Sequence, residues 1–128
     1  MRIGIIEVFV ADQDEALRFY TEVLGFQVKT DAPYSDSGRW LTVASPEDPD
    51  GTQLLLAPLN EPAAALQQAR RESGTPAVSF TSTDCRRDYE ELKARGATFL
   101  FEPRAMDYGG TDAVFDDGCG NLLNLHED

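Results

Sequence analysis

Four side chains of this sequence could take part directly in chemistry, and they stand far apart along the chain. Glu7 and the single histidine, His126, could donate or accept protons as general acids or bases. Cys85 and Cys119 could act as nucleophiles, but only as thiolates. Cys85 opens an expected helix, whose dipole favours a thiolate, while the neighbouring Asp84 opposes it, so we expect its side chain to pack. Cys119 lies in a glycine turn, where we expect an exposed thiol with no neighbouring base. Glu7 and His126 are therefore the candidate catalytic residues.

The charge of the chain limits what those residues could act on. The 128 residues include 23 acidic and 11 basic side chains, which gives a net charge of −12, and 41% of the residues are hydrophobic. This composition and length are typical of one globular domain. So acidic a surface repels polyphosphates and anionic lipids, and we therefore expect no nucleic-acid and no membrane partner. The negative charge favours solubility and biases binding toward cationic or neutral ligands.

The location of the protein is also an expectation from composition. Two distant cysteines do not form a disulfide framework, so both are expected to be reduced. No apolar run approaches the length of a membrane span, and Glu7 interrupts the first apolar stretch before a signal peptide could form. We expect a soluble cytoplasmic protein.

The elements that would position these side chains occur in the same order twice. In each half a strand precedes a helix that begins at an aspartate cap and ends at a glycine, Asp12 to Gly25 and Asp84 to Gly96. Three further strands follow each helix, and a helix at 61–73, with Pro62 near its start, links the halves. The expected strands are 3–10, 27–30, 39–44 and 54–56, then 77–81, 98–101, 111–115 and 122–125. We expect a single domain, 1–128, with a first module at 1–58 and a second at 76–128.

Several segments of the repeat resemble a known family. They are Val8-Phe9-Val10-Ala11-Asp12, Ala16-Leu17-Arg18-Phe19-Tyr20, Leu24-Gly25-Phe26, the run from Tyr89 to Gly96, and Asp116-Asp117-Gly118-Cys119-Gly120-Asn121. On these segments the chain resembles the vicinal-oxygen-chelate superfamily, which includes glyoxalase I, extradiol dioxygenases, fosfomycin-resistance enzymes and bleomycin-binding proteins. The resemblance implies an α+β fold of two βαβββ modules, whose mixed sheets curl around a shared cavity, and a homodimer.

The metal ligands of that family are missing here. In its metal-dependent members four inward-facing positions carry His or Glu, and the resemblance maps these positions onto Ile5, Leu55, Ala77 and Asn124. Three of these side chains cannot bind a metal, and a lone asparagine is a weak ligand. Glu7, Gln53 and His126 each lie two residues from a lost position, but they are too few to rebuild the site. We expect no metal and no other cofactor.

What remains of the family's cavity predicts a binding site for a small organic molecule. Alternation along the strands turns one face inward, with an apolar wall and a few polar groups. Tyr108 and the segment 34–38 are expected in mobile loops over the opening, where a tyrosine could stack on a ligand. Trp40 could instead belong to the core of a strand. The predicted ligand-binding residues are Ile5, Glu7, Phe9, Trp40, Leu55, Ser79, Tyr108, Asn124 and His126.

Three kinds of function are compatible with these features of the sequence. The first is a metal-independent protein of the glyoxalase/bleomycin-resistance type that sequesters a cationic or aromatic compound. The second is a glyoxalase-like lyase or other enzyme that uses acid–base residues such as Glu7 or His126. The third is a dimeric structural or regulatory module whose cavity is filled by apolar side chains.

Overall fold

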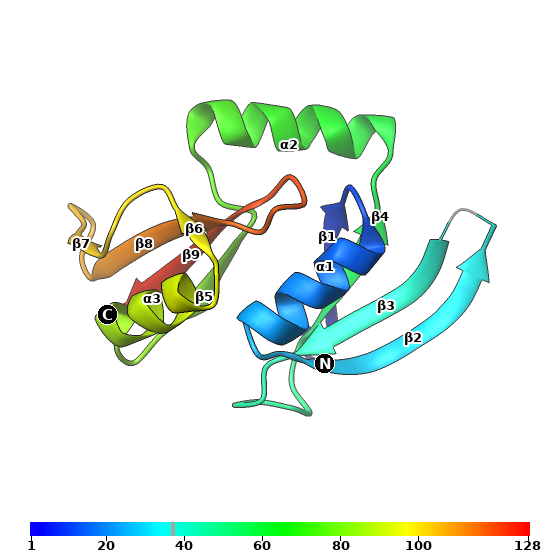
Figure 1. Ribbon diagram of the computed structural model, residues 1–128, viewed down its shortest axis with the longest axis horizontal. Coiled ribbons are helices and arrows are strands. Elements are labelled where there is room, and N and C mark those ends of the chain that lie inside the picture. Colours follow the sequence, from blue (N-terminus) through cyan, green and yellow to red (C-terminus); the bar gives the residue numbers. More distant parts are fainter. Residues whose placement is uncertain (37) are drawn as a thin grey trace.

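Two mixed β-sheets, joined by a long helix, form the protein in the computed structural model, which describes residues 1–36 and 38–128 (Figure 1). The first sheet has the strand order β1-β4-β3-β2, in which β1 is parallel to β4 and the other neighbours are antiparallel. Its elements are β1 (Ile5–Val10), α1 (Gln13–Arg18), the π-helical turn η1 (Phe19–Val23), β2 (Gln27–Ser35), β3 (Gly38–Ala44) and β4 (Gln53–Pro58).

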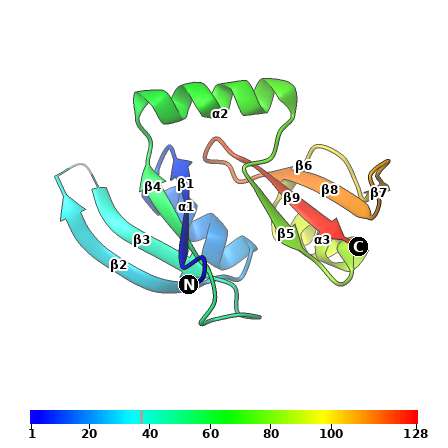
Figure 2. The same ribbon diagram turned by 180° about the vertical axis from the view of Figure 1, so that it is seen from behind.

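The second sheet repeats this arrangement. Its order is β5-β9-β8-β6, with β7 also paired to β8 and with β5 parallel to β9. Its elements are β5 (Val78–Thr81), α3 (Cys85–Ala94), β6 (Thr98–Phe99), β7 (Arg104–Ala105), β8 (Thr111–Asp116) and β9 (Leu122–Glu127). Helix α2 (Glu61–Ser73) spans both sheets (Figure 2). The α+β class and the two βαβββ-like modules predicted from the repeat are confirmed.

The helix signals in the sequence act as expected. Asp12 accepts a hydrogen bond from the amide of Glu15 at 2.9 Å, and Asp84 accepts one from the amide of Arg87 at 2.9 Å. Gly25 follows the first helix with a φ of +76°, a conformation that glycine adopts at little cost. Among the helices of the described residues, none is long and apolar enough to cross a membrane.

Two connections differ from the prediction. Strand β2 continues to Ser35, so Tyr34 belongs to a strand and not to a mobile loop; residue 37 of the predicted segment 34–38 lies outside the described residues. The Tyr34 ring packs at 5.6 Å from that of Trp40 on β3, and this pairing extends the hairpin. In the second module the unpredicted β7 pairs with β8 through Arg104 and Asp112.

One hydrophobic core joins the two modules. It contains residues of β1, β3 and β4 together with residues of α3, β8 and β9. Two aromatic contacts cross between the modules: Phe19 lies 6.4 Å from Phe115, and Phe26 lies 5.5 Å from Phe80 in an edge-to-face arrangement. Helices α1 and α3 therefore contribute to the core between the modules. The other face of each sheet lies outside this core.

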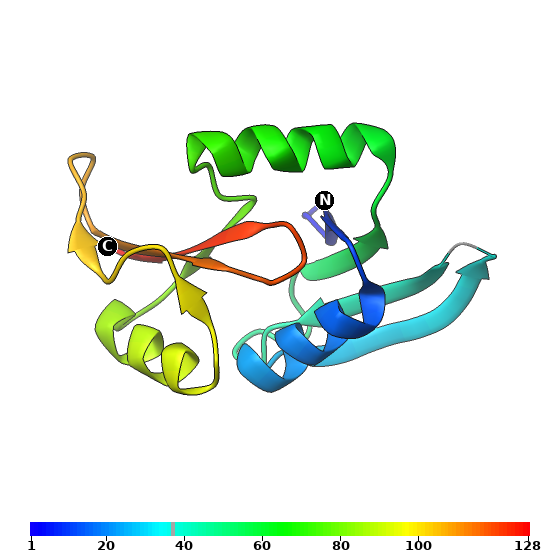
Figure 3. The same cartoon turned by 45° about the horizontal axis from the view of Figure 1, so that its top comes forward.

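Three residues of the turn between β8 and β9 are buried, namely Asp117, Cys119 and Asn121, which corrects the expectation of an exposed Cys119. Asp117 and Cys119 are only 1% and 2% exposed. The Asp117 carboxylate accepts hydrogen bonds from the Cys119 and Asn121 amides and from the Tyr20 hydroxyl at 2.9 Å. The turn reaches the first module, where the amide of Ala11 donates to the Cys119 carbonyl at 3.1 Å (Figure 3). Sequence spacing alone could not show this contact between the ends of the chain.

Candidate ligand-binding site

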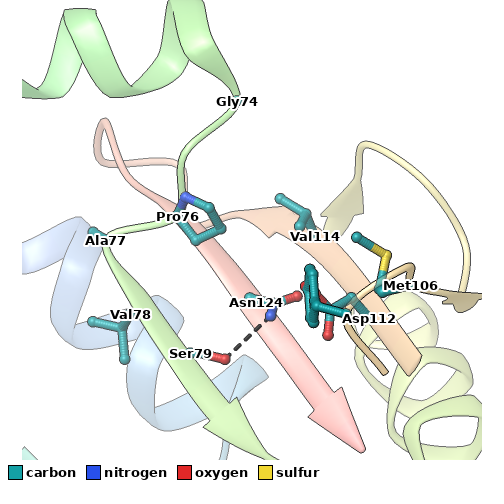
Figure 4. A pocket seen from close by; sticks show the side chains of 10 residues that line it. Gly74, Pro76, Ala77, Val78, Ser79, Met106, Asp112, Val114 and Asn124 are labelled. Atoms are coloured by element: carbon teal, nitrogen blue, oxygen red, sulfur yellow. Dashed lines mark hydrogen bonds between the residues drawn. The ribbon is translucent and has the colours of Figure 1, made fainter. Parts of the chain in front are cut away.

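A hollow of about 340 Å³ lies over the face of the second sheet that is turned away from its core (Figure 4). Strands β5, β8 and β9 form its floor, because alternation sends Leu123 and Leu125 into the core and Asn124 to the opposite face. Among the described residues, all those that line it come from the second half of the chain: Gly74, Pro76, Ala77, Val78, Ser79, Met106, Tyr108, Asp112, Val114 and Asn124.

The strand register explains why the polar groups meet here. Ser79 on β5 lies opposite Asn124 on β9, and Asn124 lies opposite Val114 on β8. Asp112 lies opposite His126 one step further along the same pair of strands. Three residues predicted for the site, Ser79, Tyr108 and Asn124, therefore line one hollow.

The Asn124 amide is one of two almost fully buried polar groups that line the hollow. It is 7% exposed, and its Nδ2 donates to Ser79 Oγ at 3.1 Å. Its Oδ1 is buried without a hydrogen-bond partner. A buried oxygen without a donor is unfavourable by about 1–3 kcal/mol. A half-turn of the amide would direct Nδ2 toward Asp112 and Oδ1 toward the Ser79 hydroxyl, so that both ends of the amide would be paired within the chain.

Asp112 is a buried carboxylate that is absent from the residues predicted for the site. It is 3% exposed and accepts hydrogen bonds from the Tyr108 hydroxyl and from Nδ1 of His126, the latter at 2.6 Å. Burial raises the pKa of Asp112, but hydrogen bonds with Tyr108, His126 and Asn124, together with the charge of His126, outweigh burial and hold the pKa below its usual value. The sequence does contain a signal for Asp112, because alternation along the expected strand at 111–115 puts residues 112 and 114 on one face.

His126 lies at the edge of this cluster and is not a frayed terminal residue. It belongs to β9, and its ring is held by Asp112 at Nδ1 and by Asp128 at Nε2, 3.1 Å away. The hydrogen bond with Asp112 raises the pKa of His126, which favours the imidazolium. With both ring nitrogens bound to carboxylates, it is better suited to fixing the Tyr108 loop than to accepting a proton.

The other predicted site residues lie on the first sheet. Ile5 is 47% exposed, Glu7 is exposed and Phe9 is half-buried along β1. Leu55 on β4 lies opposite Glu7 and is buried, and Trp40 on β3 is half-buried against Tyr34. Arg39, which precedes Trp40 on β3, binds Asp14 and Asp31. Within one chain these five predicted residues form a separate surface from the hollow.

The residues at the family's metal positions do not fit a metal ion. Ile5, Leu55 and Ala77 offer no donor atom, and Asn124 offers a single amide oxygen. In the part of the chain that the structure describes, no three His, Cys, Asp or Glu side chains are grouped so that they could hold a metal.

Neither thiol has the surroundings of a nucleophile. Burial raises the pKa of Cys85 to about 11 and that of Cys119 to about 12, and nearby carboxylates add to both effects. Cys85 packs inside as expected, whereas the burial of Cys119 overturns the prediction of an exposed side chain.

Comparison with known proteins agrees with this fold. The family model of the Glyoxalase/Bleomycin resistance protein/Dioxygenase superfamily matches residues 2–125. The chain belongs to this superfamily. It is 48% identical to the uncharacterized protein YurT of Bacillus subtilis (strain 168) over 126 residues, which cover 98% of each chain.

Two solved structures are similar to this chain over nearly their whole length. UcmS2 superposes with a TM-score of 0.82 at 32% identity, covering 98% of this chain and 97% of its own. TnmS3, an antibiotic binding protein from Streptomyces sp. CB03234, superposes with a TM-score of 0.78 at 27% identity, covering 99% and 95%.

Proposed function

We propose that the protein binds a small organic molecule in the hollow of the second sheet and does so without a metal ion. The observation that carries this proposal is the hollow of about 340 Å³ itself, in which the polar Ser79, Asp112 and Asn124 gather beside apolar side chains such as Met106 and Val114. Apolar walls with a few convergent polar groups are typical of small-molecule sites of this size.

The similarity to TnmS3 supports a binding role, since that protein is described as an antibiotic binding protein. The hollow also argues for binding over the alternative of a cavity filled by apolar side chains. We propose a cationic or aromatic ligand, because Tyr108 is 70% exposed beside the hollow and the chain carries a charge of −12. Ser79, Tyr108, Asn124 and the neighbouring His126 would form one side of the site.

We also propose that a second copy of the chain supplies the other side. The face of the first sheet that is turned away from the core carries Glu7, Phe9, Trp40 and Leu55, and it presents Ile5 to water at 47% exposure. Covering this surface would remove apolar area from water and could bring Ile5, Glu7, Phe9, Trp40 and Leu55 to the partner's hollow. Light scattering should then give twice the 14.1 kDa of one chain. A monomer at protein concentrations of tens of micromolar would overturn this part of the proposal.

A second candidate function, acid–base catalysis, rests on the Asp112–His126 pair. A carboxylate at Nδ1 orients an imidazole for proton transfer, and here the raised pKa of His126 would favour a general acid. For any compound found to bind, His126→Asn should then abolish turnover while binding persists. Unchanged turnover would remove His126 from the mechanism.

The direct test of binding is a thermal-shift screen of protein that has been treated with EDTA, using cationic and aromatic compounds that include bleomycin. A ligand that binds only the folded state adds about 2.7 kcal/mol at a hundred times its dissociation constant. We expect at least one such compound, and its effect should be lost in Ser79→Trp, which fills the hollow from an exposed position. Stabilisation that is equal in Ser79→Trp would place the ligand elsewhere.

A further inference from the structure

A second and larger cavity, which we call the inter-module cleft, lies on the helix side of the molecule, away from the hollow. Its volume is about 610 Å³, and it lies between the residues that follow η1, the loop after β3, and helix α3. This volume falls within the range of sites for drug-sized molecules. The residues that line the hollow and those that line the inter-module cleft do not overlap.

The floor of the inter-module cleft is apolar and contributed by both modules. Leu24 and Phe26 come from the first module, and Phe80, Leu92 and Leu125 come from the second. The edge-to-face contact between Phe26 and Phe80, at 5.5 Å, fixes the two rings relative to one another. Both rings are only half-buried, although they pack against the core. A flat apolar group placed on them would gain aromatic contacts and displace water from a floor that is already formed.

The charges on the cleft walls cancel except at one position. Arg87 donates to Asp88 at 3.1 Å. Arg95 lies 3.9 Å from Glu91 and also donates to the Val23 carbonyl. These two ion pairs commit both guanidinium groups, so an anionic ligand would have to displace a carboxylate from one of them.

Among the described carboxylates that line the cleft, Glu47 is the one that is not paired with an arginine. It lies on the exposed loop after β3, and no hydrogen bond or ion pair found among the described residues involves its side chain. A positively charged group in the cleft would meet Glu47 without breaking an existing pair, in the field of a chain of charge −12.

We infer that the inter-module cleft is a second ligand site, which takes an amphiphilic cation with its aromatic body on Phe26 and Phe80 and its amine toward Glu47. This site is separate from the hollow and does not depend on the function proposed there. A compound that binds here would contact both modules at once.

The test uses 1-naphthylmethylamine as the probe and the uncharged 1-naphthalenemethanol as its control, both titrated into ¹⁵N-labelled protein at low salt. The amine should shift the amide signals of Phe26, Glu47 and Phe80 in a saturable way and bind more tightly than the alcohol. Saturable shifts at Ser79 and Asn124 alone would place the amine in the hollow. That result would overturn the cleft proposal and support ligand binding in the hollow. Equal binding of the alcohol would overturn the assignment of a cation.

Three variants complete the test. Glu47→Gln should weaken the amine by up to about fivefold, the upper end for an exposed ion pair, and leave the alcohol unchanged. Glu90→Gln removes the same charge from an exposed position of α3 that does not line the cleft, and it should have no effect. Thr83→Trp should block the cleft and weaken both probes at least tenfold. Equal affinities for Glu47→Gln and Glu90→Gln would contradict the role of Glu47, even if Thr83→Trp fails to fold.

Discussion

Asp112 and His126 face each other across strands β8 and β9, and Nδ1 of the imidazole lies 2.6 Å from the buried carboxylate. The same carboxylate accepts the hydroxyl hydrogen bond of Tyr108, so one aspartate fixes both the end of β9 and the loop above the hollow. The pair therefore connects the protonation of a histidine to the edge of the proposed binding site.

This relationship predicts a stability that depends on pH. Because Asp112 raises the pKa of His126 in the folded chain, the folded state binds the proton more tightly than the unfolded state. The stabilisation is complete below the ordinary histidine pKa of about 6.5 and is lost as the pH rises through the raised value. The free energy of unfolding of the wild type minus that of His126→Asn, from urea melts, should fall as the pH rises from about 5 to 9. A difference that grows with pH would reverse the sign we assign.

Gly110 lies against His126, and the space there does not admit a side chain at residue 110. It has a φ of +76°, and a Cβ there would lie 2.5 Å from the Glu127 carbonyl oxygen and 2.6 Å from the His126 ring. Gly109, with a φ of +104°, has nothing within 4 Å of such an atom and provides a matched control. Gly109→Ala should cost about 1–2 kcal/mol of stability, and Gly110→Ala about 1–3 kcal/mol more. Denaturant melts that give equal losses would show that this contact is unimportant.

The buried turn between β8 and β9 predicts a large effect of one hydroxyl. Tyr20 is fully buried and donates to Asp117 at 2.9 Å, and burial together with this carboxylate raises its pKa. Tyr20→Phe leaves the carboxylate short of one donor, so we expect a loss of about 1–3 kcal/mol in unfolding free energy. Tyr34→Phe, at a tyrosine that is 73% exposed, should change stability by less than about 0.5 kcal/mol. Similar values for both variants would argue against the buried hydrogen bond.

Both cysteines are predicted to be unreactive in the folded protein. Their pKa values of about 11 and 12 and their burial leave little accessible thiolate in mildly alkaline buffer. Ellman's reagent should react with neither thiol within minutes in buffer and with both in concentrated guanidinium chloride. Rapid reaction of a single thiol in buffer would show that one of them is accessible.

The helix caps and every strand except β7 were predictable from the sequence, because they depend on spacing between near neighbours along the chain. Alternation also predicts that Ser79 and Asn124 face inward, and the structure pairs the two residues across β5 and β9. The burial of Asp117 was not predictable in this way, because it depends on contacts with Tyr20, 97 positions away. Alternation along its strand points to Asp112, but the pattern does not distinguish a buried aspartate from the many solvated ones of an acidic chain.

Binding of a small molecule in the hollow without a metal is tested most directly by isothermal titration of an Asn124→Leu variant. Leucine keeps the volume of the side chain but removes the polar amide from the floor of the hollow. With a compound that stabilises the wild type, we predict the same affinity before and after EDTA treatment, and binding at least tenfold weaker in Asn124→Leu. Binding that requires an added divalent ion, or that is as tight in Asn124→Leu as in the wild type, would contradict metal-free binding at this site.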